Sequence, residues 1–383
     1  MSGLRIAMLA HSTNPRGGVV HALELCEALA GLGHAPALFA PDVSGQGFYR
    51  AAECTLVALP AKPAACDVAA MVHQRVAEYL TFFTPELCAR FDLFHAQDSI
   101  SANALASLRA AGRISGFVRT VHHLDDFAVA ELGRLQARGV EEAAFLFTVS
   151  QAGRDEVRER FGREALCIGN GVNPRLFSHL ADARDVALRE RLGLEHGPVV
   201  LSLGGIEPRK NSLAVLKAFQ MLRRDMPGAV LVIAGGATLL DHGAYRAAFL
   251  SALAASGLPE TAVRVLGRLS QDEMPALYRL AQVLAFPSLR EGFGLAVLEA
   301  MASLVPVVVP RAAPFTEYLG QEDAAWCDAS DPASIADGLR HALGPAGAAL
   351  RQRGLKVARR WRWRDSACAH LPVYETMRSH AHA

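Results

Sequence analysis

The sequence predicts an α/β protein built from two doubly wound domains that face each other across a cleft. Short apolar runs alternate with helical stretches along the chain, and this alternation is typical of parallel sheets covered by helices on both faces. The alternation breaks at one polar segment and then restarts. The chain has 383 residues, more than one hydrophobic core usually serves, so two Rossmann-like domains are expected.

The first domain is expected over residues 1–180. It opens with the apolar run "LRIAMLA", the loop "HSTNPRGG" and a helix whose Val19, Leu23 and Cys26 share one face. That helix should end at the glycines of 31–33, where a C-cap is expected. Further strands are expected at "APALFAP", "CTLVAL", "FDLFHA", "FVRTVHH", "AFLFTVS" and "ALCIG".

The second domain is expected over residues 190–362, after a polar, turn-rich connection at 174–197. Its strands are expected at "PVVLSLGG", "AVLVIAGG", "VRVLGRL", "VLAFPSL" and "PVVVP", with helices between them. Ligands of such domains bind at the carboxyl ends of the strands. The last segment, 363–383, is expected to be a helix that crosses back to the first domain.

Composition limits the function classes. Apolar residues make up 51% of the chain and charged residues 20%, and the formal net charge is +1, so no global field recruits nucleic acid or a membrane. No run of about 18 apolar residues exists to span a bilayer. The first apolar run stops at His11 and is too short for the core of a signal peptide, so we expect it to be a first strand.

The cysteines predict a reducing location. The number of cysteines is odd and none are spaced as CxxC, which argues against a disulfide framework or a zinc site. Reduced, buried thiols in a cytoplasmic protein are expected. The seven cysteines are Cys26, Cys54, Cys66, Cys88, Cys167, Cys327 and Cys368.

One segment is strongly basic. Residues 338–364 contain eight Arg or Lys and no Asp or Glu. A solvated helical face is the favoured interpretation. The alternative is a patch that touches anionic lipid, at the inner face of a membrane, or an anionic acceptor.

The first glycine corner precedes a helix. Gly17 and Gly18 would let the backbone approach a ligand closely, and the helix start presents free N–H groups to an anion. An ordinary tight turn would look the same. The fingerprint GxGxxG is absent, which argues against a binding site for a nicotinamide or flavin cofactor.

Two histidines end a predicted central strand. His122 and His123 are followed by Asp125 and Asp126. Adjacent residues of a strand point to opposite faces, so the two rings do not chelate a metal together easily. We expect His122 to donate a hydrogen bond to a substrate, with a purely structural histidine as the alternative.

A basic pair follows the first strand of the second domain. Arg209 and Lys210 stand just before a helix that Asn211 or Ser212 could cap. Two cations beside a positive helix end repel one another unless an anion arrives. A diphosphate would suit that place, and two solvated loop charges are the alternative.

Two glutamates flank another helix start, in the stretch "EGFGLAVLE". Glu291 precedes a glycine corner, and Glu299 lies within an apolar helix, where its carboxylate should meet a hydrogen-bond donor. Eight residues of helix rise by roughly 12 Å, about the reach of a sugar diphosphate. The corner of Gly292, Phe293, Gly294 and Leu295 would present backbone amides to phosphate oxygens between the two acids. A chance surface acid and a first-turn acid are the alternative.

These motifs resemble a known family. "EGFGLAVLE" is similar to the E-x7-E signature of the family-four retaining glycosyltransferases, which have the two-domain GT-B architecture. "GGVVHALELCEALAGLGH", "TVHH" and "WRWRDSACAHLPVY" resemble the family's glycine loop, strand end and closing helix, in the correct order. "IGNGVNPRLF" resembles its hinge-side element, with Asn173 in place of the usual Asp.

The resemblance implies sugar transfer from a nucleoside diphosphate donor, UDP- or GDP-linked, to a small-molecule, glycan or lipid hydroxyl. By this analogy Glu291 contacts the donor sugar, as an anchor rather than a nucleophile, and Glu299 binds the ribose. Lys210 and Arg209 neutralise the diphosphate, with help from the corner amides. His122 touches the donor sugar, and Gly17 and Gly18 lie beside the diphosphate.

One departure from the family concerns the phosphate site. The family's second domain usually opens with a Gly-Arg pair, whereas this chain has Gly204-Gly205. Arg209 is therefore expected to substitute for the missing arginine. No DxD motif appears, which is consistent with a metal-independent enzyme that needs no cofactor.

Other functions remain open at this level. A GT-B phosphorylase or sugar-nucleotide epimerase would use the same cleft for a different reaction. A non-catalytic nucleotide-sugar or glycan-binding protein would keep the fold, but both glutamates and the basic pair argue against it.

Overall fold

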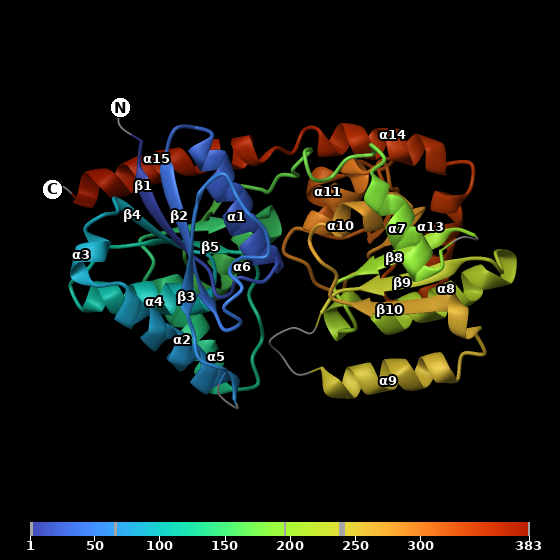
Figure 1. Ribbon diagram of the computed structural model, residues 1–383, viewed down its shortest axis with the longest axis horizontal. Helices are drawn as coiled ribbons and strands as arrows, with labels where there is room; N and C mark the ends of the chain where they lie inside the picture. The colour runs from blue at the N-terminus through green and yellow to red at the C-terminus, as the bar shows by residue number, and fades with distance from the viewer. Residues whose placement is uncertain (1–2, 65–66, 195–196, 237–241, 382–383) are drawn as a thin grey trace. The chain divides into compact units, whose positions relative to one another are not determined.

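A computed structural model describes residues 3–64, 67–194, 197–236 and 242–381. The chain forms two compact units, shown in Figure 1. Unit 1 comprises residues 1–171 and 363–383, and unit 2 comprises residues 172–362. The division falls before residue 180, where the first domain was expected to end.

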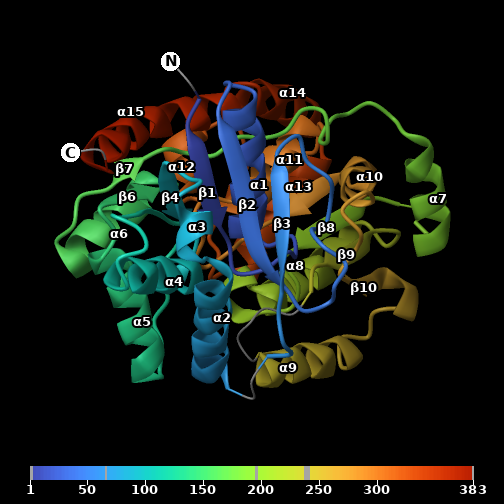
Figure 2. The same ribbon diagram turned by 60° about the vertical axis from the view of Figure 1, so that its left-hand side comes forward.

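Unit 1 contains a seven-stranded sheet in the order β3-β2-β1-β4-β5-β6-β7, in which every paired strand is parallel. Figure 2 shows β3, β2 and β1 next to one another. The strands are β1 (Arg5–Leu9), β2 (Ala35–Asp42), β3 (Thr55–Pro60), β4 (Leu93–Ala96), β5 (Val118–Val121), β6 (Phe145–Thr148) and β7 (Leu166–Cys167).

Helices cover both faces of this sheet. Phe94 of β4 packs in the core formed with α2, α4 and α5, whereas the next residue, His95, bonds to Tyr374 of α15. Because successive strand residues point to opposite faces, α15 covers the other face, where it packs on α1. The helices are α1 (Gly17–Ala30), α2 (Val68–Phe82), α3 (Pro85–Cys88), α4 (Ser99–Ala110), α5 (Ala130–Glu141), α6 (Gln151–Phe161) and α15 (Trp363–Ala381).

Unit 2 contains a six-stranded parallel sheet in the order β10-β9-β8-β11-β12-β13. Its topology matches the first six strands of unit 1, so the two sheets confirm the predicted doubly wound fold class. The strands are β8 (Val199–Leu203), β9 (Val230–Ala234), β10 (Val263–Gly267), β11 (Val283–Ala285), β12 (Val307–Pro310) and β13 (Ala325–Cys327).

The helices of unit 2 bury apolar stripes against this sheet. Val215, Phe219 and Leu222 of α8 recur at helical spacing and lie fully in the core, where α8 packs on α13. The elements are α7 (Ala183–Leu192), η1 (Pro208–Lys210), α8 (Ser212–Asp225), α9 (Gly243–Ala254), η2 (Glu260–Ala262), α10 (Met274–Leu280), α11 (Leu295–Ala302), α12 (Phe315–Tyr318), α13 (Pro332–Leu343) and α14 (Gly347–Ala358).

The polar segment at 174–197 is not a simple connection, and that expectation was wrong. It contains α7, which Asp182 caps and Gly193 ends in the left-handed conformation. Asp185 of α7 forms an ion pair of 2.7 Å with Arg279 of α10. The polar residues of this segment therefore cap a helix and attach it to unit 2.

The cysteines are partly as expected. The described cysteines are free thiols, but Cys368 is exposed, so burial is not general; Cys66 lies outside the described residues. Within the described ranges, no helix combines the length and apolar character needed to cross a bilayer.

A buried histidine network joins α15 to the sheet of unit 1. The Nδ1 and Nε2 atoms of His95 lie 2.7 Å from the Tyr374 hydroxyl and 2.8 Å from Thr120 Oγ1. His370 donates from Nδ1 to the carbonyl of Ser366 at 2.8 Å. The ring of His370 lies 4.3 Å from the Phe147 ring.

These histidines are held neutral. Burial lowers the pKa of His370 from 6.5 to about 3 and that of His21, on α1, to about 4. Burial likewise lowers the pKa of His95. In the described chain, the Nε2 atoms of His21 and His370 have no hydrogen-bond partner, so protonation there would leave a charge unpaired.

We predict that unit 1 loses stability as the pH falls below 6.5. Below pH 6.5 these histidines bind protons in the unfolded chain but not in the folded protein. The equilibrium constant for folding therefore falls by up to about tenfold per histidine for each pH unit, until the pH reaches the pKa of that histidine in the folded protein. Hydrogen exchange at pH 7.5 and 5.0 checks this. Protection of β1 and β4 amides should fall at least about tenfold more than protection of β8 amides.

His370→Leu removes one of the titrating groups and should reduce the difference between the units. Equal losses of protection in β4 and β8 would contradict the prediction.

Candidate functional site

The site in unit 2 begins at the carboxyl ends of two neighbouring parallel strands, β8 and β11. β8 lies between β9 and β11, and the strand order reverses at the β8–β11 pair. In doubly wound sheets ligands bind at the carboxyl ends of strands at this reversal. Lys210 follows β8 and Glu291 follows β11, so the topology places both side chains at that point.

A glycine places Lys210. Gly204 has φ +107°, and a Cβ on it would lie 2.5 Å from Cε of Lys210. The stem of Lys210 therefore occupies the space that a side chain at position 204 would need. Any residue other than glycine there would displace the lysine.

Lys210 is buried and paired. Its Nζ lies 2.7 Å from Oε2 of Glu291 and 4.3 Å from the centre of the Phe286 ring, so two features hold the cation in a pocket where its side chain is only 9% exposed. Burial lowers the pKa of Lys210, and the carboxylate of Glu291 opposes that effect.

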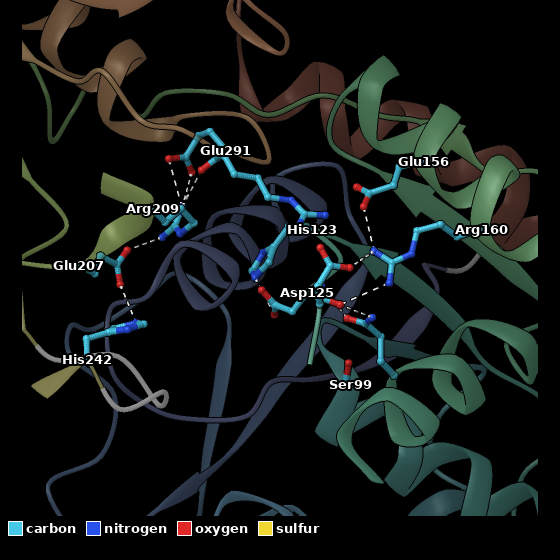
Figure 3. Close-up of polar contacts among 12 residues, drawn as sticks. Ser99, His123, Asp125, Glu156, Arg160, Glu207, Arg209, His242 and Glu291 are labelled. Carbon is cyan, nitrogen blue, oxygen red and sulfur yellow. Dashed lines mark hydrogen bonds and ion pairs between the residues drawn. The ribbon is translucent and has the colours of Figure 1, made fainter. Parts of the chain in front are cut away.

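Arg209 bridges two carboxylates (Figure 3). Its Nη1 lies 3.2 Å from Oε2 of Glu291, and its Nη2 lies 2.9 Å from Oε1 of Glu207. The expectation that the basic pair repels until an external anion arrives was therefore wrong. The chain supplies its own anions, because Glu207 and Glu291 already balance the two cations.

The capping prediction was also wrong. Asn211 stands at the N-cap of α8 with φ +60°, but its side chain does not cap the helix. Its amide donates to the carbonyls of Pro287, at 3.2 Å, and Ala329, at 2.6 Å. The hydroxyl of Ser212 donates to the carbonyl of Gly205 at 3.1 Å. Both side chains tie neighbouring loops together.

The glycine corner before α11 has the expected form. Gly294 has φ +92°, and a Cβ on it would lie 2.8 Å from the Phe315 ring. Phe293 is buried and stacks on Tyr318 at 4.9 Å. Among the described residues, no side chain caps α11. The backbone N–H groups at the helix start, in the corner from Gly292 to Leu295, are therefore open to an anion.

Glu299 meets the hydrogen-bond donor predicted for it. The hydroxyl of Tyr278, on α10, donates to Oε2 of Glu299 at 2.5 Å. Burial, and next the carboxylate of Glu299, raise the pKa of Tyr278, so the phenol stays protonated. Glu299 itself is only partly buried.

In unit 1, Gly18 lies against His122. A Cβ on Gly18 would lie 3.1 Å from Cδ2 of that ring, whereas a Cβ on Gly17 would meet open space. The Nε2 of His122 lies 3.1 Å from Oε1 of Gln97. Burial and then the nearby His21 lower the pKa of His122 well below its usual value, so this ring is neutral.

His123 and the aspartates have partners other than His122. His123 is exposed and its Nε2 lies 3.3 Å from Oδ2 of Asp125. Asp126 lies 3.2 Å from Arg160. Searching the described ranges reveals no group of three or more His, Cys, Asp or Glu residues suited to a metal ion.

Sequence reasoning missed the residues that hold this site in place. Phe286 and Tyr278 contact Lys210 and Glu299 from other elements, and Glu207 contacts Arg209 from the same turn. Glu207 looks like an ordinary loop acid, and Phe286 and Tyr278 look like core residues. The contacts of Phe286 and Tyr278 depend on pairings that no local pattern reports.

Two family models match the chain. The model described as Glycosyltransferase Family 4 matches residues 15–176, and the model described as Glycosyl transferases group 1 matches residues 187–354. Together they include every part of the unit 2 site from Gly204 to Glu299, and both Gly17 and His122 of unit 1.

Curated relatives carry related names. The D-inositol 3-phosphate glycosyltransferase of Salinispora arenicola is 31% identical over 293 residues, an alignment that covers 74% of this chain and 63% of the relative. A GDP-mannose-dependent alpha-(1-6)-phosphatidylinositol monomannoside mannosyltransferase of Mycolicibacterium smegmatis is 32% identical, with 55% and 57% covered. The chain thus spans about three fifths of the length of these relatives.

Solved structures share the fold. Sucrose-phosphate synthase from Thermosynechococcus elongatus has a TM-score of 0.79 at 19% identity, with 98% of this chain and all of that chain covered. HepE from Anabaena, in complex with UDP-glucose, has a TM-score of 0.76 at 19% identity, with 98% and 100% covered. From the two family models, with the agreement of fold, the chain belongs to glycosyltransferase family four.

Proposed function

We propose that the chain is a retaining glycosyltransferase that moves a sugar from a UDP- or GDP-linked donor to a hydroxyl acceptor. One observation carries the proposal: Lys210, Arg209 and Glu291 meet at the carboxyl ends of β8 and β11. Two cations and an open helix start at that point suit a diphosphate. Family membership and neighbours whose titles name UDP support a nucleotide donor.

Charge stabilisation explains how the site would act. As the sugar leaves, negative charge builds on the diphosphate, and groups aimed at that charge lower the barrier. Lys210 is the strongest candidate because burial strengthens its electrostatic effect and Gly204 sets its position. Arg209 and the amides of the Gly292–Leu295 corner would add to it, so no metal ion is needed in this proposal.

Glu291 suits an anchoring role. Its carboxylate accepts from Lys210 at 2.7 Å and from Arg209 at 3.2 Å. Oxygens engaged by two cations are weak nucleophiles, which favours a hydrogen bond to the donor sugar over covalent attack. Transfer with retention would then bring the acceptor to the same face of the sugar that the diphosphate leaves.

Glu299 suits ribose binding. A carboxylate accepts hydrogen bonds from the two hydroxyls of a ribose, and the bond from Tyr278 fixes its orientation. Tyr278 is fully buried, so it would hold Glu299 in place before any ligand binds. The roles expected of Gly17, Gly18 and His122 stay predictions.

The acceptor is proposed to be a small-molecule, glycan or lipid hydroxyl, the classes that the relatives' names include. The basic segment offers less free charge than its sequence indicates. Arg340 pairs with Asp225 and Asp337, and Arg353 pairs with Glu322. These pairs favour a solvated face over a lipid-binding patch. The cytoplasmic location stays a prediction.

Calorimetric titration with UDP and GDP, followed by turnover of UDP-glucose and GDP-mannose, tests the proposal. Transfer of sugar to an alcohol supports a transferase, whereas transfer to phosphate would indicate a phosphorylase, and a changed donor sugar an epimerase. Binding without turnover would indicate a binding protein. No binding of either nucleotide at millimolar concentration would count against every one of these functions.

We predict that Lys210 and Glu299 have separable effects. Lys210→Ala should lower kcat at least about tenfold, because a charge aimed at the leaving group acts mainly in the transition state. Glu299→Ala should instead weaken nucleotide binding more than it lowers kcat. Steady-state kinetics and calorimetry measure both.

The exposed Lys217→Ala on α8 is the matched control and should behave as wild type. Circular dichroism should show both site variants folded. Wild-type kinetics in Lys210→Ala and Glu299→Ala would contradict the assignment of the site.

We predict that restoring the family's arginine fails. Gly205 has φ +80°, and a Cβ there would lie 3.2 Å from the carbonyl oxygens of Gly235 and Gly236. Gly205→Arg should therefore lower the free energy of unfolding by more than the roughly 1–2 kcal/mol that a left-handed L-residue costs, and the melting temperature should fall accordingly. It should not raise activity.

Gly257→Arg is the matched control, because Gly257 has φ +68° and its Cβ would meet open space. If the two variants have the same melting temperature, or if Gly205→Arg is more active than the wild type, this explanation of Gly205 is wrong.

A further inference from the structure

Glu207 is a buried carboxylate without a role in the function proposed above. It lies between β8 and η1, and its side chain is only 5% exposed. Burying a carboxylate is costly unless charged or polar groups compensate it. Its position, two residues before Arg209 and three before Lys210, places it beside the cations expected to bind a diphosphate.

Both oxygens of Glu207 have neighbouring nitrogens (Figure 3). Oε1 accepts from Nη2 of Arg209 at 2.9 Å. Oε2 lies 3.7 Å from Nε2 of His242, which precedes α9, and this contact is an ion pair only when the histidine is protonated. The hydrogen bond to Arg209 is therefore the firm contact of this buried carboxylate.

Arg209 is the side chain that this anchor orients. It is 37% exposed and long, so without a partner it would sample many rotamers. The guanidinium is planar, and a bond to one of its terminal nitrogens fixes the direction of the other. With Nη2 on Glu207, Nη1 lies 3.2 Å from Glu291, on the side where the donor is expected.

The need for an anchor follows from Gly205. A side chain at that position is disfavoured by φ +80° and by close contact with the carbonyl oxygens of Gly235 and Gly236, 3.2 Å from its Cβ. The second cation must come from Arg209, on a turn rather than on the strand end. A flexible arginine there would lose entropy on binding an anion, and a held one would not.

We propose that Glu207 is a positioning residue that orients Arg209 toward the leaving diphosphate. This inference rests on the proposed function. Its predicted effect on anion binding is opposite in sign to the effect expected from charge alone. Removing a negative charge beside an anion site should strengthen anion binding, whereas removing the residue that orients Arg209 should weaken it.

Calorimetry with UDP and GDP tests the inference on four proteins: wild type, Glu207→Gln, Arg209→Ala and the double variant. Arg209→Ala should weaken binding of the preferred nucleotide about tenfold, and Glu207→Gln at least about threefold. The double variant should stay within about twofold of Arg209→Ala, because the inference assigns the effect of Glu207 on binding to its contact with Arg209.

Asp185→Asn is the matched control for loss of a partly buried acid–arginine pair in the same unit. It should lower the melting temperature and leave nucleotide affinity unchanged. Affinity in Glu207→Gln equal to or tighter than wild type would overturn the inference, as would losses that add fully in the double variant. Wild type that binds neither nucleotide would instead contradict the proposed function.

Discussion

The site of unit 2 depends on a missing side chain. Lys210 reaches Glu291 because its stem runs through the space where a Cβ of Gly204 would lie, at 2.5 Å from Cε. No hydrogen bond or ion pair could replace this steric condition. The turn after β8 also packs on the turn after β9, where a Cβ on Gly235 would lie 2.4 Å from the backbone of Gly205. The ends of these two adjacent strands can therefore approach closely only because the residues there are glycines, which have no side chain.

This close packing converts a cation pair into a balanced cluster. Lys210 and Arg209 are each paired with a carboxylate, and burial lowers the pKa of Lys210 while Glu291 opposes that effect. A ligand that binds here exchanges one set of charge pairs for another, so it does not have to neutralise two bare cations. Binding should therefore depend on geometry as much as on charge.

The sequence predicted what local patterns encode. The parallel strands, the C-cap glycines after α1 and the hydrogen-bond donor for Glu299 follow from periodicity, turn chemistry and the cost of a bare carboxylate. It failed where the partner is distant in sequence. Asn211 ties Pro287 to Ala329 instead of capping α8, and Asp185 of α7 pairs with Arg279. Charge balance at Arg209 likewise needed Glu291, 82 residues away, in addition to the nearby Glu207.

The interrupted course of the chain has a consequence for biosynthesis. Unit 1 is completed by α15, whose His370 and Tyr374 cover the sheet beside His95 and Phe147. On the ribosome, α15 emerges only after the whole of unit 2, so until then the first unit lacks the helix that covers part of one face of its sheet. Unit 2 is continuous and can finish folding first. A chaperone that shields the exposed face during this interval would assist this chain more than one whose units are each continuous.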